Sequence, residues 1–112
     1  MHINKDKAEH YVWGDQCDGW FLERSADRTI IQERMPAGTS EIKHRHEKAK
    51  QFFFILKGEA VMWVDGQEFT LQPQDGCTIE PGVAHQIRNE SKEEVDFLVI
   101  STPSTAGDRI PL

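Results

Sequence analysis

Residues 51–71 read QFFFILKGEAVMWVDGQEFTL, and this stretch decides the fold class. It contains three short runs rich in aromatic and branched apolar residues, separated by Gly58 and by Asp65-Gly66. An Asp-Gly pair between two such runs is the strongest short signal for a two-residue β-hairpin turn. The stretch therefore predicts strands joined by tight turns, over residues 51–56, 60–64 and 67–71.

The same alternation of short runs and turn residues continues on both sides. Residues 29–35 form a run that ends at Pro36-Ala37-Gly38, and residues 95–101 form a last run near the end of the sequence. No helical period of useful length interrupts the pattern. Many short strands with regular Gly and Pro breaks are typical of a β-sandwich or β-barrel, so we predict an all-β chain.

The length allows one domain. A chain of 112 residues, 38% of them hydrophobic, can bury one small core. We expect a single domain over residues 1–112 with its core at about 28–101. Residues 10–24 are predicted as N-terminal strands, and residues 102–112 as a C-terminal tail that is loose or wraps a neighbouring molecule.

Charge and composition argue against several classes of partner. The net charge of −6 repels phosphate backbones and anionic lipid headgroups. The longest apolar run, residues 52–56, is too short to span a bilayer, and residues 1–9 lack the apolar stretch of a secretion signal. Cys17 and Cys77 have no CxxC spacing. We expect a cytoplasmic protein with reduced thiols, and no nucleic-acid or membrane partner.

Three histidines form the candidate metal site. His44 and His46 are two residues apart, so on a strand both imidazoles point to the same face. His85 follows Pro81-Gly82, a turn that would direct the next strand back towards the first pair. Imidazole ligands suit Fe, Ni, Mn, Zn or Cu better than Ca or Mg, and three protein ligands leave coordination positions open. We predict one divalent transition-metal ion of undetermined identity.

These residues and their spacing resemble the two motifs of the cupin superfamily. The first motif, Gly, His-x-His, Glu and Gly, corresponds here to Gly38, His44, His46, Gln51 and Gly58. The second motif corresponds to Gln74-Asp75, Glu80, Gly82, His85 and Asn89. The resemblance covers residues 30–101 and implies a double-stranded β-helix, or jelly-roll barrel, in a small single-domain cupin. The sequence departs from the usual pattern at Gln51, Gln74 and Glu80.

Gln51 takes the position at which the resemblance implies a metal-binding Glu. Its amide oxygen is either the fourth ligand or a hydrogen-bond partner beside a three-histidine site. In both cases the ion keeps its full charge of +2, which favours anionic ligands. Glu47 could replace the missing carboxylate, but it follows His46 directly and strand alternation points it away.

Strand alternation also predicts an apolar outer face. Phe53 and Ile55 share a face with Gln51 and should line the interior, which leaves the neighbouring apolar side chains outside and in need of cover: Phe52, Phe54 and Leu56. We therefore expect a homodimer. The cluster Trp13, Cys17 and Trp20 is interpreted mainly as structural, although it could form an aromatic wall for a substrate. Arg34, Arg45 and Arg88 are interpreted as solvated surface charges, although any that points inward could bind a substrate carboxylate.

The function expected from these features is a metal-dependent enzyme, dioxygenase-like, that acts on a small organic substrate. A sugar or keto-acid isomerase and a non-catalytic small-molecule-binding cupin are the alternatives. The isomerase needs a general base, and the sequence around the histidine motifs offers no clear one. No catalytic residue is assigned, and the sequence leaves the substrate and the metal open because one fold hosts many chemistries.

Overall fold

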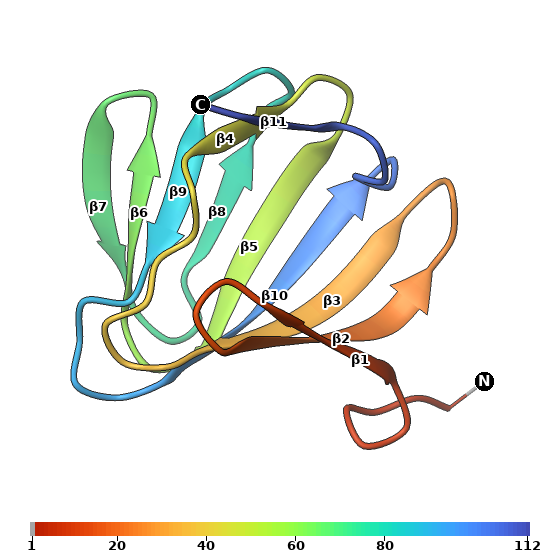
Figure 1. Cartoon of the computed structure of the whole chain (residues 1–112), viewed down its shortest axis with the longest axis horizontal. Coiled ribbons are helices and arrows are strands. Elements are labelled where there is room, and N and C mark those ends of the chain that lie inside the picture. The colour runs from red at the N-terminus through yellow and green to blue at the C-terminus, as the bar shows by residue number, and fades with distance from the viewer. Residues whose placement is uncertain (1) are drawn as a thin grey trace.

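The computed structural model describes residues 2–112 as two antiparallel β-sheets that face each other (Figure 1). The six-stranded sheet has the order β1-β2-β3-β10-β5-β8, with bounds Glu9–Trp13, Cys17–Arg24, Thr29–Met35, Val95–Thr102, Lys50–Lys57 and Gly76–Ile79. The five-stranded sheet has the order β11-β4-β9-β6-β7, with bounds Arg109–Pro111, His44–His46, His85–Arg88, Ala60–Val64 and Gln67–Leu71. These described residues contain no helix, and hence none that could cross a membrane. The prediction of an all-β chain is confirmed.

The β6–β7 hairpin turns where the Asp-Gly signal predicts it. Val64 pairs with Gln67, and both intervening residues have positive φ, 47° at Asp65 and 90° at Gly66. Two consecutive residues with positive φ are what a type I′ turn requires, and this turn matches the twist of the flanking strands.

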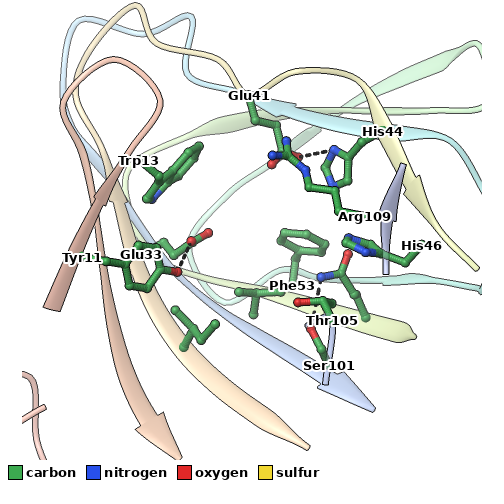
Figure 2. A pocket seen from close by; sticks show the side chains of 13 residues that line it. Tyr11, Trp13, Glu33, Glu41, His44, His46, Phe53, Ser101, Thr105 and Arg109 are labelled. Atoms are coloured by element: carbon green, nitrogen blue, oxygen red, sulfur yellow. Dashed lines mark hydrogen bonds and ion pairs between the residues drawn. The ribbon is translucent and has the colours of Figure 1, made fainter. Parts of the chain in front are cut away.

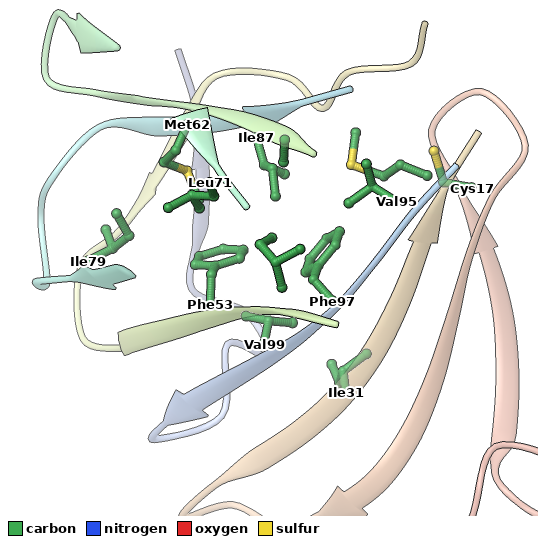
Figure 3. Packing of buried hydrophobic residues seen from close by; sticks show 13 residues of the cluster. Cys17, Ile31, Phe53, Met62, Leu71, Ile79, Ile87, Val95, Phe97 and Val99 are labelled. Atoms are coloured by element: carbon green, nitrogen blue, oxygen red, sulfur yellow. The ribbon is translucent and has the colours of Figure 1, made fainter. Parts of the chain in front are cut away.

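The core lies between the two sheets and is built by strand alternation. In β5, Phe53 and Ile55 are buried, whereas Phe52 and Leu56 on the other face remain 38% and 37% exposed. Figure 3 shows Phe53, Phe97 and Val99 of one sheet facing apolar side chains of the other, which include Met62, Leu71 and Ile87. The predicted inward and outward faces of β5 are therefore confirmed.

The C-terminal segment differs from the loose tail that the sequence suggests. Its strand β11 pairs with β4, with Arg109 opposite His46 (Figure 1). The Asp108 carboxylate accepts backbone N–H bonds from three successive residues after β4, Glu47, Lys48 and Ala49. Because these contacts hold the segment on its own chain, it forms part of the wall beside the histidines.

Candidate metal centre and cavity

The two sheet neighbours β4 and β9 bring the three predicted histidines together. His44 pairs directly with His85, and all three side chains are buried. One ring nitrogen from each of His44, His46 and His85 lies within 4.8 Å of the other two. This spacing allows one ion to contact all three rings.

Hydrogen bonds and burial prepare these rings as ligands. His44 and His85 each donate Nδ1–H to a carbonyl two residues earlier, at 2.8 Å to Ile42 O and 3.0 Å to Val83 O. A carbonyl only accepts, so Nδ1 carries the proton and Nε2 of the neutral ring keeps a free lone pair. Nδ1 of His46 is buried without a hydrogen-bond partner among residues 2–112. Burial lowers the pKa of His44 to about 3 and also lowers the pKa of His46 and His85, so all three rings are neutral near pH 7.

Gln51 on β5, in the opposite sheet, places its side-chain amide beside His85. Its Oε1 lies 3.0 Å from Nε2 of His85, and its Nε2 donates to Ser101 Oγ at 3.1 Å. In this orientation two lone pairs face each other without a hydrogen between them, and a shared cation would satisfy both. A rotated amide would instead donate to His85, which corresponds to the hydrogen-bond interpretation. The donor set therefore fits a metal ion, because one nitrogen from each ring lies close to the other two and the Gln51 amide oxygen lies beside Nε2 of His85.

A cavity of about 200 Å³ opens beside this centre. Figure 2 shows Tyr11, Trp13 and Glu33 on one side and His44, His46 and Arg109 on the other. Gln51 also lines the cavity. Ligand sites commonly measure about 300–1,000 Å³, so this one suits a small molecule.

Two acidic groups share the cavity with the histidines. Burial raises the pKa of Glu33 to about 7, even though a hydrogen bond from the Tyr11 hydroxyl at 2.7 Å favours its charged form. Burial also raises the pKa of Glu41 to about 8, against a 3.0 Å bond from the Ile87 N–H. Both groups can gain or lose a proton near neutrality, which is the property of a general acid or base.

Arg109 supplies a positive charge to the same cavity. Its charge lowers the pKa of Glu33, Glu41 and His44, which places the guanidinium within electrostatic reach of all three. A guanidinium binds carboxylates in a two-pronged geometry, so Arg109 can anchor an anionic group.

The cations considered from the sequence lie elsewhere. Arg34 forms ion pairs with Asp18 and Glu94, and Arg88 pairs with Glu68 and Glu90. Arg45, between the two histidines of β4, is half-buried and does not line the cavity. None of the three arginines lines the cavity, and Arg34 and Arg88 are partly buried in ion pairs and not freely solvated.

The three residues of the N-terminal cluster, Trp13, Cys17 and Trp20, lie in different surroundings. Cys17 is fully buried in the core cluster, whereas Trp13 lines the cavity wall. Trp20 lies against His10, with ring centroids 5.4 Å apart, and beneath the Lys5 ammonium. The structural interpretation fits Cys17 and Trp20, and Trp13 supplies part of an aromatic wall.

Sequence reasoning missed Tyr11, Glu33, Glu41 and Arg109 as cavity residues. A signal for Glu33 was present, because strand alternation places it on the same face as Ile31 and Met35, both of which are buried. Arg109 carried no comparable signal, since its strand exists only through pairing with β4.

Comparison with known proteins agrees with the fold and with the extent of the cupin resemblance. A family model described as "Cupin domain" matches residues 31–101. The oxalate-binding protein of Thermotoga maritima is 29% identical over 73 residues, 65% of this chain and 60% of that protein. Quercetin 2,3-dioxygenase of Bacillus subtilis is 32% identical over 99 residues, 80% of this chain and 27% of that protein. The chain therefore spans less than two thirds of the length of both relatives.

Solved structures show the same fold. A predicted oxalate decarboxylase from Thermotoga maritima superposes with a TM-score of 0.85 at 20% identity, covering 93% of this chain and all of that one. The two facing antiparallel sheets are therefore those of the jelly-roll barrel. The match of the family model to residues 31–101, more than half of the chain, shows that the chain belongs to the cupin family.

Proposed function

We propose that this cupin is a metal-dependent enzyme that moves a proton on a small organic acid bearing a carbonyl group. His44, His46 and His85 would hold one divalent transition-metal ion, Fe, Ni, Mn, Zn or Cu, with Gln51 as the fourth donor. When bound, the ion supplies a Lewis acid that polarises an oxygen of the substrate. The observation that carries the proposal is that Glu33, Glu41 and Arg109 line the same cavity as the histidines.

Each of these side chains has a task that follows from its chemistry. Arg109 binds the substrate carboxylate and thereby turns the carbonyl towards the histidines. Glu33 or Glu41 accepts a proton from the carbon beside the carbonyl and returns it to a neighbouring atom. Trp13 and Phe53 exclude water from the cavity wall. The general base that the sequence motifs lack would thus come from residues outside those motifs, which favours the isomerase type over our first expectation.

A dioxygenase-like activity is the second candidate. It is favoured by the 32% identity to a quercetin 2,3-dioxygenase over 80% of this chain. The non-catalytic alternative has its own support in the similarity to an oxalate-binding protein. The three possibilities differ in what they consume: an isomerase exchanges substrate protons with water, a dioxygenase removes dissolved oxygen, and a binding protein does neither.

Metal analysis is the first test. Protein loaded separately with Fe, Mn, Ni or Zn should retain close to one ion per chain after dialysis. His44→Ala, His46→Ala and His85→Ala should each weaken retention strongly, because two imidazoles make a poor site. Undiminished metal content in the triple variant would refute the assignment. Each loaded protein is then assayed with small keto acids for proton exchange and for oxygen consumption, which separates the three activities.

A cytoplasmic location and a homodimeric state complete the proposal. Cys17 and Cys77 are both free thiols, as expected for a reducing compartment. Phe52 and Leu56 are exposed on the outer face of β5, and a second copy of the chain would cover them.

A further inference from the structure

We propose that Glu33 is the proton-transfer residue of the cavity and that Tyr11 positions it by reaching across a gap left by Gly19. This inference rests on the proposed function, since it assigns one residue to the proton transfer. It also makes a claim about positioning that can be tested without any substrate.

The space above Gly19 that the Tyr11 ring fills results from the register of three strands. Tyr11, Gly19 and Glu33 are direct partners on three adjacent strands, β1, β2 and β3. The Tyr11 ring lies across β2 so closely that a Cβ atom on Gly19 would overlap its Cζ and hydroxyl atoms. Gly19 has no positive φ, so glycine serves here to provide space and not backbone freedom. Only a residue without a side chain lets the Tyr11 hydroxyl reach Glu33, two strands away.

Glu33 is an unusual occupant of its position. Its neighbours on the inward face of β3, Ile31 and Met35, belong to the hydrophobic core cluster. An acidic group at such a place costs free energy that an apolar residue would not, unless it has partners or a function. Tyr11 donates to Oε2, whereas Oε1 has no hydrogen-bond partner among residues 2–112 and is the oxygen available to a ligand.

The charged and titratable groups around Glu33 come from four elements. Tyr11 lies on β1, Cys17 on β2, Glu41 precedes β4, and Arg109 lies on β11. Burial raises the pKa of Glu33 to about 7, while the Tyr11 bond and the charge of Arg109 lower it. Burial, followed by the charge of Glu33, raises the pKa of Tyr11, so the phenol stays protonated and remains a permanent donor.

The proposed proton transfer needs no reactant other than Glu33 and the substrate. The Glu33 carboxylate removes a proton from the carbon beside the carbonyl of a bound keto acid. The C–H electron pair forms the enolate double bond, and the carbonyl oxygen takes the negative charge. If the Glu33 carboxylic acid returns this proton to the carbon, the starting compound forms again. If it returns the proton to the oxygen, the enol isomer forms. In both cases Glu33 is again a carboxylate.

The positioning claim is tested by titration. Protein with ¹³C-labelled Glu side chains, loaded with diamagnetic Zn, is titrated by NMR, and Glu33→Gln identifies the Glu33 signal. Tyr11→Phe removes only the hydroxyl that favours the carboxylate, so the Glu33 midpoint should be higher than in the Zn-loaded protein with Tyr11 unchanged. Val12→Ala, a neighbouring change at an exposed side chain, should leave it in place. An unchanged midpoint in Tyr11→Phe would overturn the positioning claim.

The gap at Gly19 is tested by stability. Gly19→Ala should lower Tm by on the order of 5–10 °C because the Tyr11 ring must move. The same change in a Tyr11→Ala chain should have little effect, since the overlapping ring is absent. Equal losses in both backgrounds would show that Gly19 does not make room for Tyr11.

The catalytic claim is tested with pyruvate as the probe. Exchange of its methyl protons in D₂O, followed by ¹H NMR, should be accelerated by the Zn-loaded protein. Glu33→Gln should reduce the rate by about 100-fold or more, and Tyr11→Phe should move the pH of half-maximal rate upward. Glu59→Gln, an exposed acid remote from the cavity lining, is the matched control.

The outcomes separate the two proposals. Exchange that persists in Glu33→Gln overturns this inference and leaves the proposed function standing, with Glu41 as the remaining acid of the cavity. Protein that binds pyruvate without accelerating exchange overturns the proton-transfer function, and the titration still decides whether Tyr11 positions Glu33.

Discussion

The side-chain amide of Gln51 decides whether an ion bound by the three histidines would have a fourth protein donor. Gln51 lies 3.0 Å from His85 Nε2 through its oxygen, so Gln51→Glu would place a negative charge beside a +2 ion. Attraction between such charges at short range is on the order of several kcal/mol, even at an effective dielectric constant near 20 and before desolvation. We expect Gln51→Glu to bind metal more tightly and anionic ligands more weakly than the unchanged protein. Chelator competition on wild type, Gln51→Glu and Gln51→Ala measures this, and three equal affinities would remove Gln51 from the ligand set.

The buried acids predict how stability depends on pH. The pKa of Glu33 is raised from its ordinary 4.5 to about 7, so between these values the folded chain holds a proton that the unfolded chain has released. The contribution of Glu33 to folding stability is therefore present below about pH 4.5 and is lost as the pH rises through 7. Glu33→Gln should match wild type near pH 4.5 and exceed it at pH 8 by about 1–3 kcal/mol.

The stabilities of wild type and Glu33→Gln are compared in metal-free protein, because the loss of a bound ion in acid would itself change the free energy of unfolding. Urea unfolding at both pH values gives the difference between the two chains. The charge of Glu33 helps to raise the pKa of Glu41, so both chains are compared in a Glu41→Gln background, which leaves the effect of Glu33 alone. A difference that stays constant with pH would show that Glu33 is ionised normally.

At the scale of elements, the short strand β11 carries Arg109 into the cavity. Three backbone N–H groups bind the Asp108 carboxylate, at 2.9 Å from Glu47, 3.1 Å from Lys48 and 3.0 Å from Ala49. Asp108→Ala removes all three bonds, so β11 should loosen and the protein should lose about 1–3 kcal/mol of stability. Binding of the probe acid pyruvate to the metal-loaded variant, measured by calorimetry, should fall nearly as far as in Arg109→Ala. Undiminished pyruvate affinity in Asp108→Ala would show that β11 is held by other contacts.

The same elements show what a sequence can and cannot reveal. His44 and His46 are recognisable because they are two apart on one strand, and His85 because a Gly turn precedes it. Tyr11 and Glu33 are 22 residues apart and meet only through the pairing of β1, β2 and β3. No local pattern encodes that register. The strand β11 was predicted as a tail because two prolines and a glycine in 102–112 are typical of loops.

At the scale of the whole molecule, the outer face of the six-stranded sheet is the expected contact between two copies. Phe52 and Phe54 lie beside Ile100 and Leu98 of β10, so the apolar surface spans two strands. Burying it would contribute several kcal/mol at about 25 cal/mol per Å². Phe54→Lys should shift the protein towards the monomer, as measured by light scattering at micromolar concentration. Phe69→Lys, at an exposed aromatic residue of β7 on the other sheet, is the control. A wild-type mass of one chain would refute the dimer.

The side chains proposed to hold the metal ion are divided between the two layers of the molecule. His44, His46 and His85 belong to the five-stranded sheet, whereas Gln51 belongs to the six-stranded sheet. An ion bound only by the imidazoles would join two neighbouring strands, but an ion that also binds Gln51 would act as a cross-link through the interior. Loading the protein should then slow amide hydrogen exchange in β5 as well as in β4 and β9, so that opening of one layer becomes coupled to opening of the other.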